Sequence, residues 1–324
     1  MVTGHGRVQQ VVRVWLPIGF FLVVALFPFY WMAITSIKPN SELYNKNVMP
    51  LIVHAPTLKH YVDLLTKSSF LLWTWNTMLV AVVATAISLV LGTMLAYPLA
   101  RMRFAGASLI AMTIAAIYLV PQPLLFIPLA DVINHLHLGN TLTSVILTYP
   151  TMLVPFCAWL LLGYFKTVPK ELEEAARIDG ASRLQTMWKI FLPLCTPGFI
   201  SAGIFAFTLS QNEFLYALIF LTKTSVRTVP VGVIAELIRG DVFYWGQLMA
   251  GALLGSIPVA LIFLTKTEVR TVPVGAIAEL VRGDVFYWGQ LMAAALLGSI
   301  PVAIIYSFFV EHYVAGLTAG SVKG

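Results

Sequence analysis

Several stretches of this chain stay apolar for about 20 residues or more, which constrains its fold more than any other feature. A helix of about that length crosses the hydrocarbon core of a bilayer. Inside a bilayer the backbone must satisfy its own hydrogen bonds, which forces such runs to be helical. The sequence therefore predicts an all-α, polytopic transmembrane bundle of about six spans. The expected spans are 14–37, 73–100, 107–130, 141–163 and 197–221, with one or two more in 247–264 and 290–310.

The composition agrees with a membrane protein. Of the 324 residues, 59% are hydrophobic and 10% are charged, whereas a soluble domain carries about 25% charged residues. The formal net charge is +6, but lysine and arginine lie between the apolar runs, where they set topology, so we expect no nucleic-acid partner. The first apolar run is longer than the core of a signal peptide, about 7–15 residues, and we expect it to remain as an uncleaved span.

Basic residues alternate between the two sides of the expected bundle. They precede the first span, join the second span to the third, and fill the loop between the fourth and fifth spans, whereas the loop after the third span has none. Cytoplasmic loops carry the excess of lysine and arginine, so the sequence predicts a cytoplasmic N-terminus and one membrane domain over residues 1–324. The basic residues of the expected inner side are Arg7, Arg13, Arg101, Arg103, Lys166, Lys170, Arg177, Arg183 and Lys189.

The sequence shows no catalytic or metal-binding constellation. His135 and His137 are two positions apart and would point to different faces of a helix, and no acidic or cysteine cluster completes a metal site. Cys157 and Cys195 lie in or beside apolar runs, where we expect them to pack as small apolar residues. The chain also has no GxxxxGK[ST] phosphate loop. We therefore expect no enzyme activity, no catalytic residue, no metal and no cofactor in this chain.

Residues 217–259 and 260–302 form a tandem duplication. The two 43-residue units differ at four positions, so the remaining 39 are identical. Each unit holds one apolar span and one polar loop, so the repeat adds one extra span. That span either moves the C-terminal tail outside or fails to cross, and we expect one copy to be misplaced, poorly packed or outside the bundle. The four differences are Ser225 and Glu268, Val233 and Ala276, Ile238 and Val281, and Gly251 and Ala294.

The polar segment 168–193 reads VPKELEEAARIDGASRLQTMWKIFLP. Pro169 followed by three glutamates favours a helix start, and Gly180 favours its end. A second short helix is expected near Ser182, with an apolar face from Leu184 to Phe191. An ordinary charged loop is the alternative, but it does not explain several small residues that would let another surface approach closely. These residues are Ala175, Ala176, Gly180 and Ala181.

Three elements of this segment occur in an order found in one family of membrane proteins. Glu174-Ala175-Ala176, Asp179-Gly180-Ala181 and the sequence IFLP at 190–193 resemble the EAA loop of ABC-importer permeases. In that family the loop forms a coupling helix that inserts into a cleft of the ATPase subunit. The resemblance implies ATPase-coupling positions at Glu174, Ala175, Ala176, Asp179, Gly180 and Ala181.

The resemblance covers most of the chain. The sequence ITSIKP after the first span, VPVG at 229–232 and the tail GLTAGSVKG are similar to the smaller partner permease of maltose-type sugar importers. Gln211 departs from the tryptophan of the family's Trp-Asn-Glu pattern. The resemblance implies a permease of the bacterial inner membrane for a sugar or related polyol. It also implies an ABC ATPase dimer that binds ATP and Mg outside this chain, a second permease subunit and an extracytoplasmic solute-binding protein.

Polar side chains within the spans are candidates for the substrate path, because their burial in lipid is costly. The candidates are Asn212 and Glu213 as a pair, with Gln122, Tyr118 and Tyr216. The alternative is interhelical hydrogen bonding or an interfacial aromatic belt. Two other functions remain open: an ion-coupled secondary transporter, which would need its own ion site and often inverted repeats, and a structural membrane subunit, which would need no docking loop.

Overall fold

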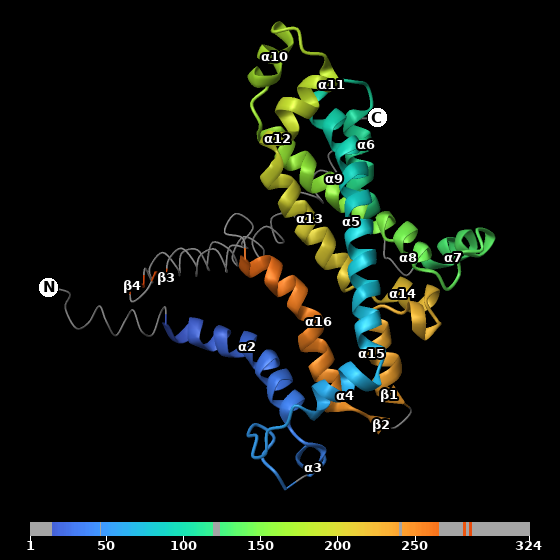
Figure 1. Cartoon of the computed structure of the whole chain (residues 1–324). Helices are drawn as coiled ribbons and strands as arrows, with labels where there is room; N and C mark the ends of the chain where they lie inside the picture. Colours follow the sequence, from blue (N-terminus) through green and yellow to red (C-terminus); the bar gives the residue numbers. More distant parts are fainter. Residues whose placement is uncertain are drawn as a thin grey trace, which may run out of the picture. The chain divides into compact units, whose positions relative to one another are not determined.

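The computed structural model describes residues 15–45, 47–118, 124–239 and 242–265, and two short strands at 281–282 and 285–286. The chain divides into two compact units, Phe27–Ile257 and the two chain ends, Met1–Leu26 with Pro258–Gly324. The unit Phe27–Ile257 contains every predicted site residue and is drawn in Figure 1 together with the rest of the chain.

Three long helices pack together in this unit: α5 (Phe70–Arg101), α9 (Pro150–Thr167) and α13 (Thr196–Gln211). Figure 1 shows them side by side along much of their length. Close packing of α5 against α9 depends on Gly92, because a Cβ there would lie 2.8 Å from the Cβ of Cys157. Cys157 and Cys195 are both buried and free, as the packing interpretation predicted.

Four helices among the described residues are long and apolar enough to cross a membrane. They are Gly19–Ile37, Phe70–Arg101, Leu142–Thr167 and Trp245–Ile262, and the bent pair Arg183–Leu194 and Thr196–Gln211, with an angle of 72°, makes a fifth candidate. The all-α membrane fold is confirmed. The total of six spans plus one stays a prediction, because the expected span at 290–310 lies outside the described residues.

The expected spans 107–130, 141–163 and 197–221 differ in the structure. Within 107–130 the structure describes α6 (Ala107–Tyr118) and α7 (Phe126–His135), and residues 119–123 between them lie outside the described residues. The span expected at 141–163 corresponds to the candidate span Leu142–Thr167, in which α8 (Leu142–Thr148) and α9 meet at Pro150, whose missing N–H suits a helix start. Within 197–221, α13 ends at Gln211 and α14 (Leu215–Phe220) begins after a break, so the prediction of one continuous helix over this range was wrong.

Two further long helices and several short elements complete the described chain. The long helices are α2 (Leu16–Ile37) and α16 (Trp245–Thr265). The remaining elements are α3 (Asn40–Leu43), α4 (Lys59–Lys67), α10 (Glu171–Ile178), α11 (Arg183–Thr186), η3 (Met187–Phe191), α12 (Leu192–Leu194), η4 (Thr224–Val226), α15 (Val229–Leu237), β1 (Ile238–Arg239), β2 (Val242–Phe243), β3 (Val281–Arg282) and β4 (Val285–Phe286).

The two copies of the repeat form the same hairpin. In the first copy Ile238 pairs with Phe243 and Arg239 pairs with Val242, and in the second the equivalent pairs join β3 to β4. The local sequence therefore fixes this hairpin wherever it occurs. Most of the second copy, 260–302, lies outside the described residues, so its misplacement stays a prediction.

Candidate coupling segment and substrate path

The predicted coupling segment, 168–193, begins with the helix α10. Its first turn carries three glutamates, which favour the positive end of the helix dipole. The helix ends where Gly180 adopts a φ of +86°, a conformation that favours glycine. The Ala181 N–H donates to the Ala176 carbonyl at 3.0 Å and the Gly180 N–H donates to the Arg177 carbonyl at 3.1 Å. These two bonds form a Schellman C-cap, so the predicted helix end at Gly180 is confirmed.

The second short helix also begins where the sequence predicted. Ser182 caps α11: its hydroxyl accepts from the Gln185 N–H at 3.3 Å, and the Gln185 side chain accepts from the Ser182 N–H at 2.9 Å. The chain then passes through a π-helical turn, η3, a distortion that is frequent at functional sites. This turn buries Phe191 completely.

The surface of the segment is partly apolar. Ile178 is 86% exposed, Leu184 is 64% exposed and Trp188 is 62% exposed. The expected apolar face from Leu184 to Phe191 is thus divided, because Phe191 packs inward while Leu184 and Trp188 face outward. Ile178 was not among the predicted docking residues.

The six predicted coupling residues do not share one environment. Ala176 is buried, with 6% exposure, so its small size serves packing inside the segment. Ala181 is half-buried. The side of the segment available to another protein therefore carries the other four, which are exposed: Glu174, Ala175, Asp179 and Gly180.

One arginine at the end of α5 contacts the segment at three places. The Arg101 Nε lies 2.8 Å from Oε1 of Glu173, and its side chain is 4% exposed. A second guanidinium nitrogen donates to the Val168 carbonyl at 2.7 Å, and the guanidinium carbon lies 4.6 Å from the centre of the Phe191 ring. The Tyr97 hydroxyl donates to the other oxygen of Glu173 at 3.2 Å. Sequence analysis treated Arg101 as a topology signal and missed these contacts.

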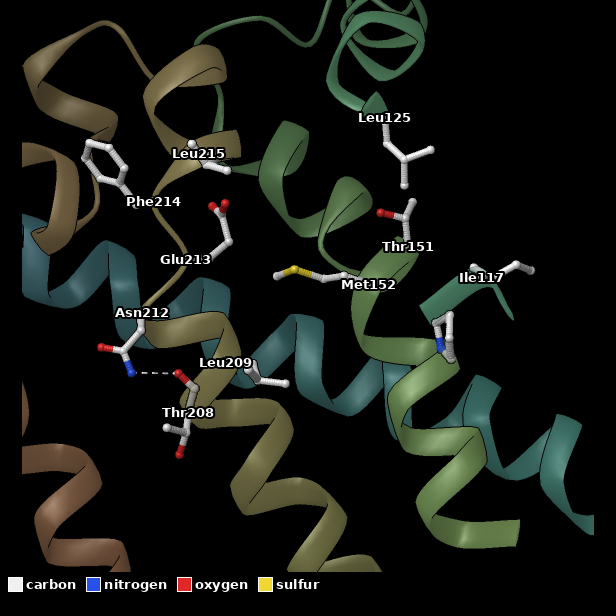
Figure 2. A pocket seen from close by; sticks show the side chains of 11 residues that line it. Ile117, Leu125, Thr151, Met152, Thr208, Leu209, Asn212, Glu213, Phe214 and Leu215 are labelled. Atoms are coloured by element: carbon white, nitrogen blue, oxygen red, sulfur yellow. Dashed lines mark hydrogen bonds between the residues drawn. The ribbon is translucent and has the colours of Figure 1, made fainter. Parts of the chain in front are cut away.

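The pair Asn212 and Glu213 lines a cavity of about 460 Å³. Figure 2 shows this cavity between α9, α13 and the break that follows α13. Its polar lining includes Thr151 and Thr208, and most of its walls are apolar. A largely apolar cavity with a few polar groups is typical of small-molecule sites. The remaining lining residues are Ile117, Leu125, Met152, Pro155, Leu209, Phe214 and Leu215.

Asn212 and Glu213 have different local partners. The buried Glu213 carboxylate accepts from the N–H groups of Tyr216 at 2.8 Å and Ala217 at 3.1 Å, so it caps α14. Figure 2 shows this carboxylate turned toward the start of α14. The exposed Asn212 amide donates to the Thr208 carbonyl of its own helix at 2.9 Å. Glu213 therefore builds the break in the span, and Asn212 is the more accessible of the two.

Of the other predicted path residues, the structure describes the side chain of Tyr216, which does not line this cavity. Tyr216 is fully buried and packs near Phe220, with 6.2 Å between ring centres, so its prediction as an accessible stacking ring was wrong. Gln122 and the side chain of Tyr118 lie outside the described residues.

Comparison with known proteins is consistent with this architecture. Residues 88–319 match the model of the binding-protein-dependent transport system inner membrane components. The sulfoquinovosyl glycerol transport system permease protein SmoH of Agrobacterium fabrum is 37% identical over 240 residues, which cover 74% of this chain and 83% of that protein. The trehalose/maltose transport system permease protein MalG of Thermococcus litoralis is 33% identical over 258 residues, which cover 78% of this chain and 91% of that protein.

Solved structures share the fold. A bacterial ABC transporter involved in the import of the acidic polysaccharide alginate superposes with a TM-score of 0.63 at 20% identity, over 97% of this chain and 99% of that chain. A bacterial alginate ABC transporter in complex with an alginate pentasaccharide-bound periplasmic protein gives a TM-score of 0.58 at 13% identity. That match covers 78% of this chain and 93% of the other chain.

The fold and the segment 168–193 define a multi-pass permease subunit of an ABC importer, as the sequence predicted. The chain belongs to the family of binding-protein-dependent transport system inner membrane components.

Proposed function

We propose that this permease carries a sugar or a related polyol across the bacterial inner membrane, with its N-terminus on the cytoplasmic side. The observation that carries the proposal is the segment 168–193, a compact element with exposed Ile178, Leu184 and Trp188 in a chain that has no phosphate loop of its own. ATP hydrolysis then belongs to a separate ABC ATPase dimer, which binds ATP and Mg, and this chain is not catalytic. The names of the relatives, which concern sulfoquinovosyl glycerol and trehalose or maltose, support the sugar class.

The partners follow from the same family. A second permease subunit completes the path, and an extracytoplasmic solute-binding protein delivers the sugar. One structural neighbour is a transporter in complex with a periplasmic protein, which supports this arrangement. The ATPase can shift the permease between its inward- and outward-facing states only if the ATPase binds these two states with different affinity.

The cavity beside the break after α13 is the proposed sugar path. The Asn212 amide and the hydroxyls of Thr151 and Thr208 offer donors and acceptors suited to sugar hydroxyl groups. We expect Asn212→Ala to reduce uptake of the sugar found to be transported among maltose, trehalose and sulfoquinovosyl glycerol. Glu213→Gln is the comparison variant: it alters the cap of α14 and leaves the Asn212 amide unchanged, so it shows how far a change in local folding alone lowers uptake. Unchanged uptake in Asn212→Ala would remove Asn212 from the path.

The docking role is tested by a matched pair of glycine substitutions. Gly180 and Gly106 both have positive φ, +86° and +88°, and a Cβ added at either position would meet no atom within 4 Å. Gly180→Trp and Gly106→Trp therefore impose similar backbone strain, but Gly180 alone lies in the coupling segment. We expect Gly180→Trp to insert normally yet lose co-purifying ATP hydrolysis, and Gly106→Trp to retain it. If both variants retained the co-purifying ATP hydrolysis equally, docking through Gly180 would be contradicted.

A separate measurement addresses the secondary transporter. Sugar uptake that is driven by an ion gradient in the absence of the ATPase would favour that alternative.

A further inference from the structure

Arg101 reaches the beginning, the helix and the end of the coupling segment at the same time. Its contacts are the Val168 carbonyl, the Glu173 carboxylate on α10 and the ring of Phe191 on η3. Val168 and Phe191 lie near opposite ends of the segment 168–193, so the side chain that ends α5 contacts both ends of the segment and its helix.

An arginine is suited to this position for chemical reasons. Its planar guanidinium donates in several directions at once and stacks on an aromatic ring, which the single ammonium group of lysine cannot reproduce. The Phe191 ring is held in turn by Tyr97 and Phe165, with ring centres 5.1 Å and 5.0 Å away. The guanidinium therefore lies on a fixed aromatic surface, and its Glu173 partner is only 15% exposed. A buried pair of this kind is costly to break from one side.

We propose that Arg101 is a positioning residue that holds the coupling segment and α5 together as one rigid body. When the ATPase moves the segment, α5 then moves with it. Because α5 packs along α9 and α13, which line the cavity, the displacement reaches the proposed sugar path. This inference rests on the proposed docking of the segment to an ATPase.

The test measures whether the two parts move together. Nitroxide labels are attached at Glu171→Cys on α10 and Met94→Cys on α5, positions that are both exposed. Cys157 and Cys195 stay in place because both are fully buried. Distances between the labels are measured by pulsed electron resonance in the full complex, without nucleotide and after trapping with ATP and vanadate. Arg101→Gln is compared with Arg103→Gln, which removes one positive charge from the same loop at an exposed position.

In the native chain and in Arg103→Gln we expect one narrow distance distribution that does not shift on ATP trapping. In Arg101→Gln we expect a broader distribution and a shift on trapping, with Arg101→Lys restoring the native behaviour only in part. A native-like distribution in Arg101→Gln, with the ATPase still bound, would overturn the inference. If the ATPase does not bind the native chain, the proposed docking has failed instead, so the two failures can be told apart.

Discussion

The two ends of α5 contact distant parts of the chain through different kinds of interaction. Figure 1 shows α15 beside the Phe70 end, and α10 and α11 beyond the Arg101 end. At the Phe70 end, neutral side chains bind backbone groups of the loop that leads into α15. At the Arg101 end, a buried charge binds a carboxylate on α10.

The neutral end depends on backbone shape. The Trp73 indole N–H donates to the Thr224 carbonyl at 3.0 Å, and the Asn76 amide donates to the Arg227 carbonyl at 3.0 Å. Such contacts tolerate changes in the side chains of the loop, because only main-chain oxygens take part. The charged end depends instead on the identity of Glu173. The Phe70 end is therefore specified by fit, whereas the Arg101 end is specified by the side chains around one buried arginine, the Glu173 carboxylate and the Phe191 ring.

The largest effect is expected at the neutral end, where Gly232 lies under the Trp73 ring. A Cβ at Gly232 would lie 2.3 Å from a ring carbon of the fully buried Trp73. We expect Gly232→Ala to destabilise the protein by about 3 kcal/mol or more, because neither the ring nor the backbone has room to move. Thermal unfolding in detergent measures the loss. Gly163→Ala is the control, because a Cβ at Gly163 would meet no atom within 4 Å, and we expect it to cause no loss of stability. An equal loss in both variants would show that contact with Trp73 is not what excludes a side chain at Gly232.

The next largest effect is expected at the charged end. Arg101→Gln leaves Glu173 without its cation, and breaking a mostly buried pair costs about 3 kcal/mol. Glu173→Gln and the double variant complete a double-mutant cycle in denaturant unfolding. We expect the double variant to lose clearly less than the two single variants added together, since both remove the same interaction. If the two single losses of unfolding free energy simply added up in the double variant, Arg101 and Glu173 would not stabilise the protein through a shared interaction. The control is Arg103→Gln at an exposed position, which should change stability by less than about 0.5 kcal/mol.

This comparison also shows where sequence reasoning succeeds. The helix end at Gly180 and the start near Ser182 were predicted because each depends on local chemistry, a positive φ in one case and a capping hydroxyl in the other. The pair Asn212 and Glu213 was singled out because polar groups in an apolar run are unusual; both line a cavity, and their role in the substrate path stays a prediction.

The missed features depend on contacts between distant segments. Arg101 follows an apolar run, and topology alone is a sufficient reason for a basic residue there, so its burial against Glu173 has no signal in the sequence. Tyr216 was misplaced because the sequence of a span does not show whether an aromatic side chain faces a path or the core. The break after Gln211 was missed because hydropathy does not record that Glu213 caps the next helix.

A smaller effect separates hydrogen bonding from fit at the neutral end. Trp73→Phe keeps an aromatic ring at this position but removes the N–H that donates to the Thr224 carbonyl. We expect a loss of about 1–2 kcal/mol, because a partly buried hydrogen bond is lost. Trp75→Phe is the control, because Trp75 lies on the same helix and is 66% exposed. A loss as large as that of Gly232→Ala would mean that the hydrogen bond, and not the fit, fastens this end.

The smallest effect concerns the carboxylate of Glu42 on α3, in the part of the chain that precedes the Phe70 end of α5. The Glu42 carboxylate accepts from the backbone N–H of His54 at 3.1 Å and of Ala55 at 2.8 Å. These bonds, that of His54 foremost, lower the pKa of Glu42 from its ordinary value of 4.5, and the nearby His54 ring and Lys38 add to this effect. A lowered pKa means that the stabilisation is present above the ordinary value and is lost as the pH falls through the lowered one.

Amide hydrogen exchange tests this loop directly. We expect the protection factors of the His54 and Ala55 amides to fall as the pH is lowered below the ordinary Glu value of 4.5 and through the lowered pKa of Glu42, and Glu42→Gln to abolish that dependence. Global stability should change little, because Glu42 binds only two backbone amides of a neighbouring loop, whereas Glu173 pairs with the Arg101 charge at the end of α5. A large loss of global stability in Glu42→Gln would contradict the comparison, since it would show that a carboxylate without a paired arginine stabilises the fold as much as Glu173 does.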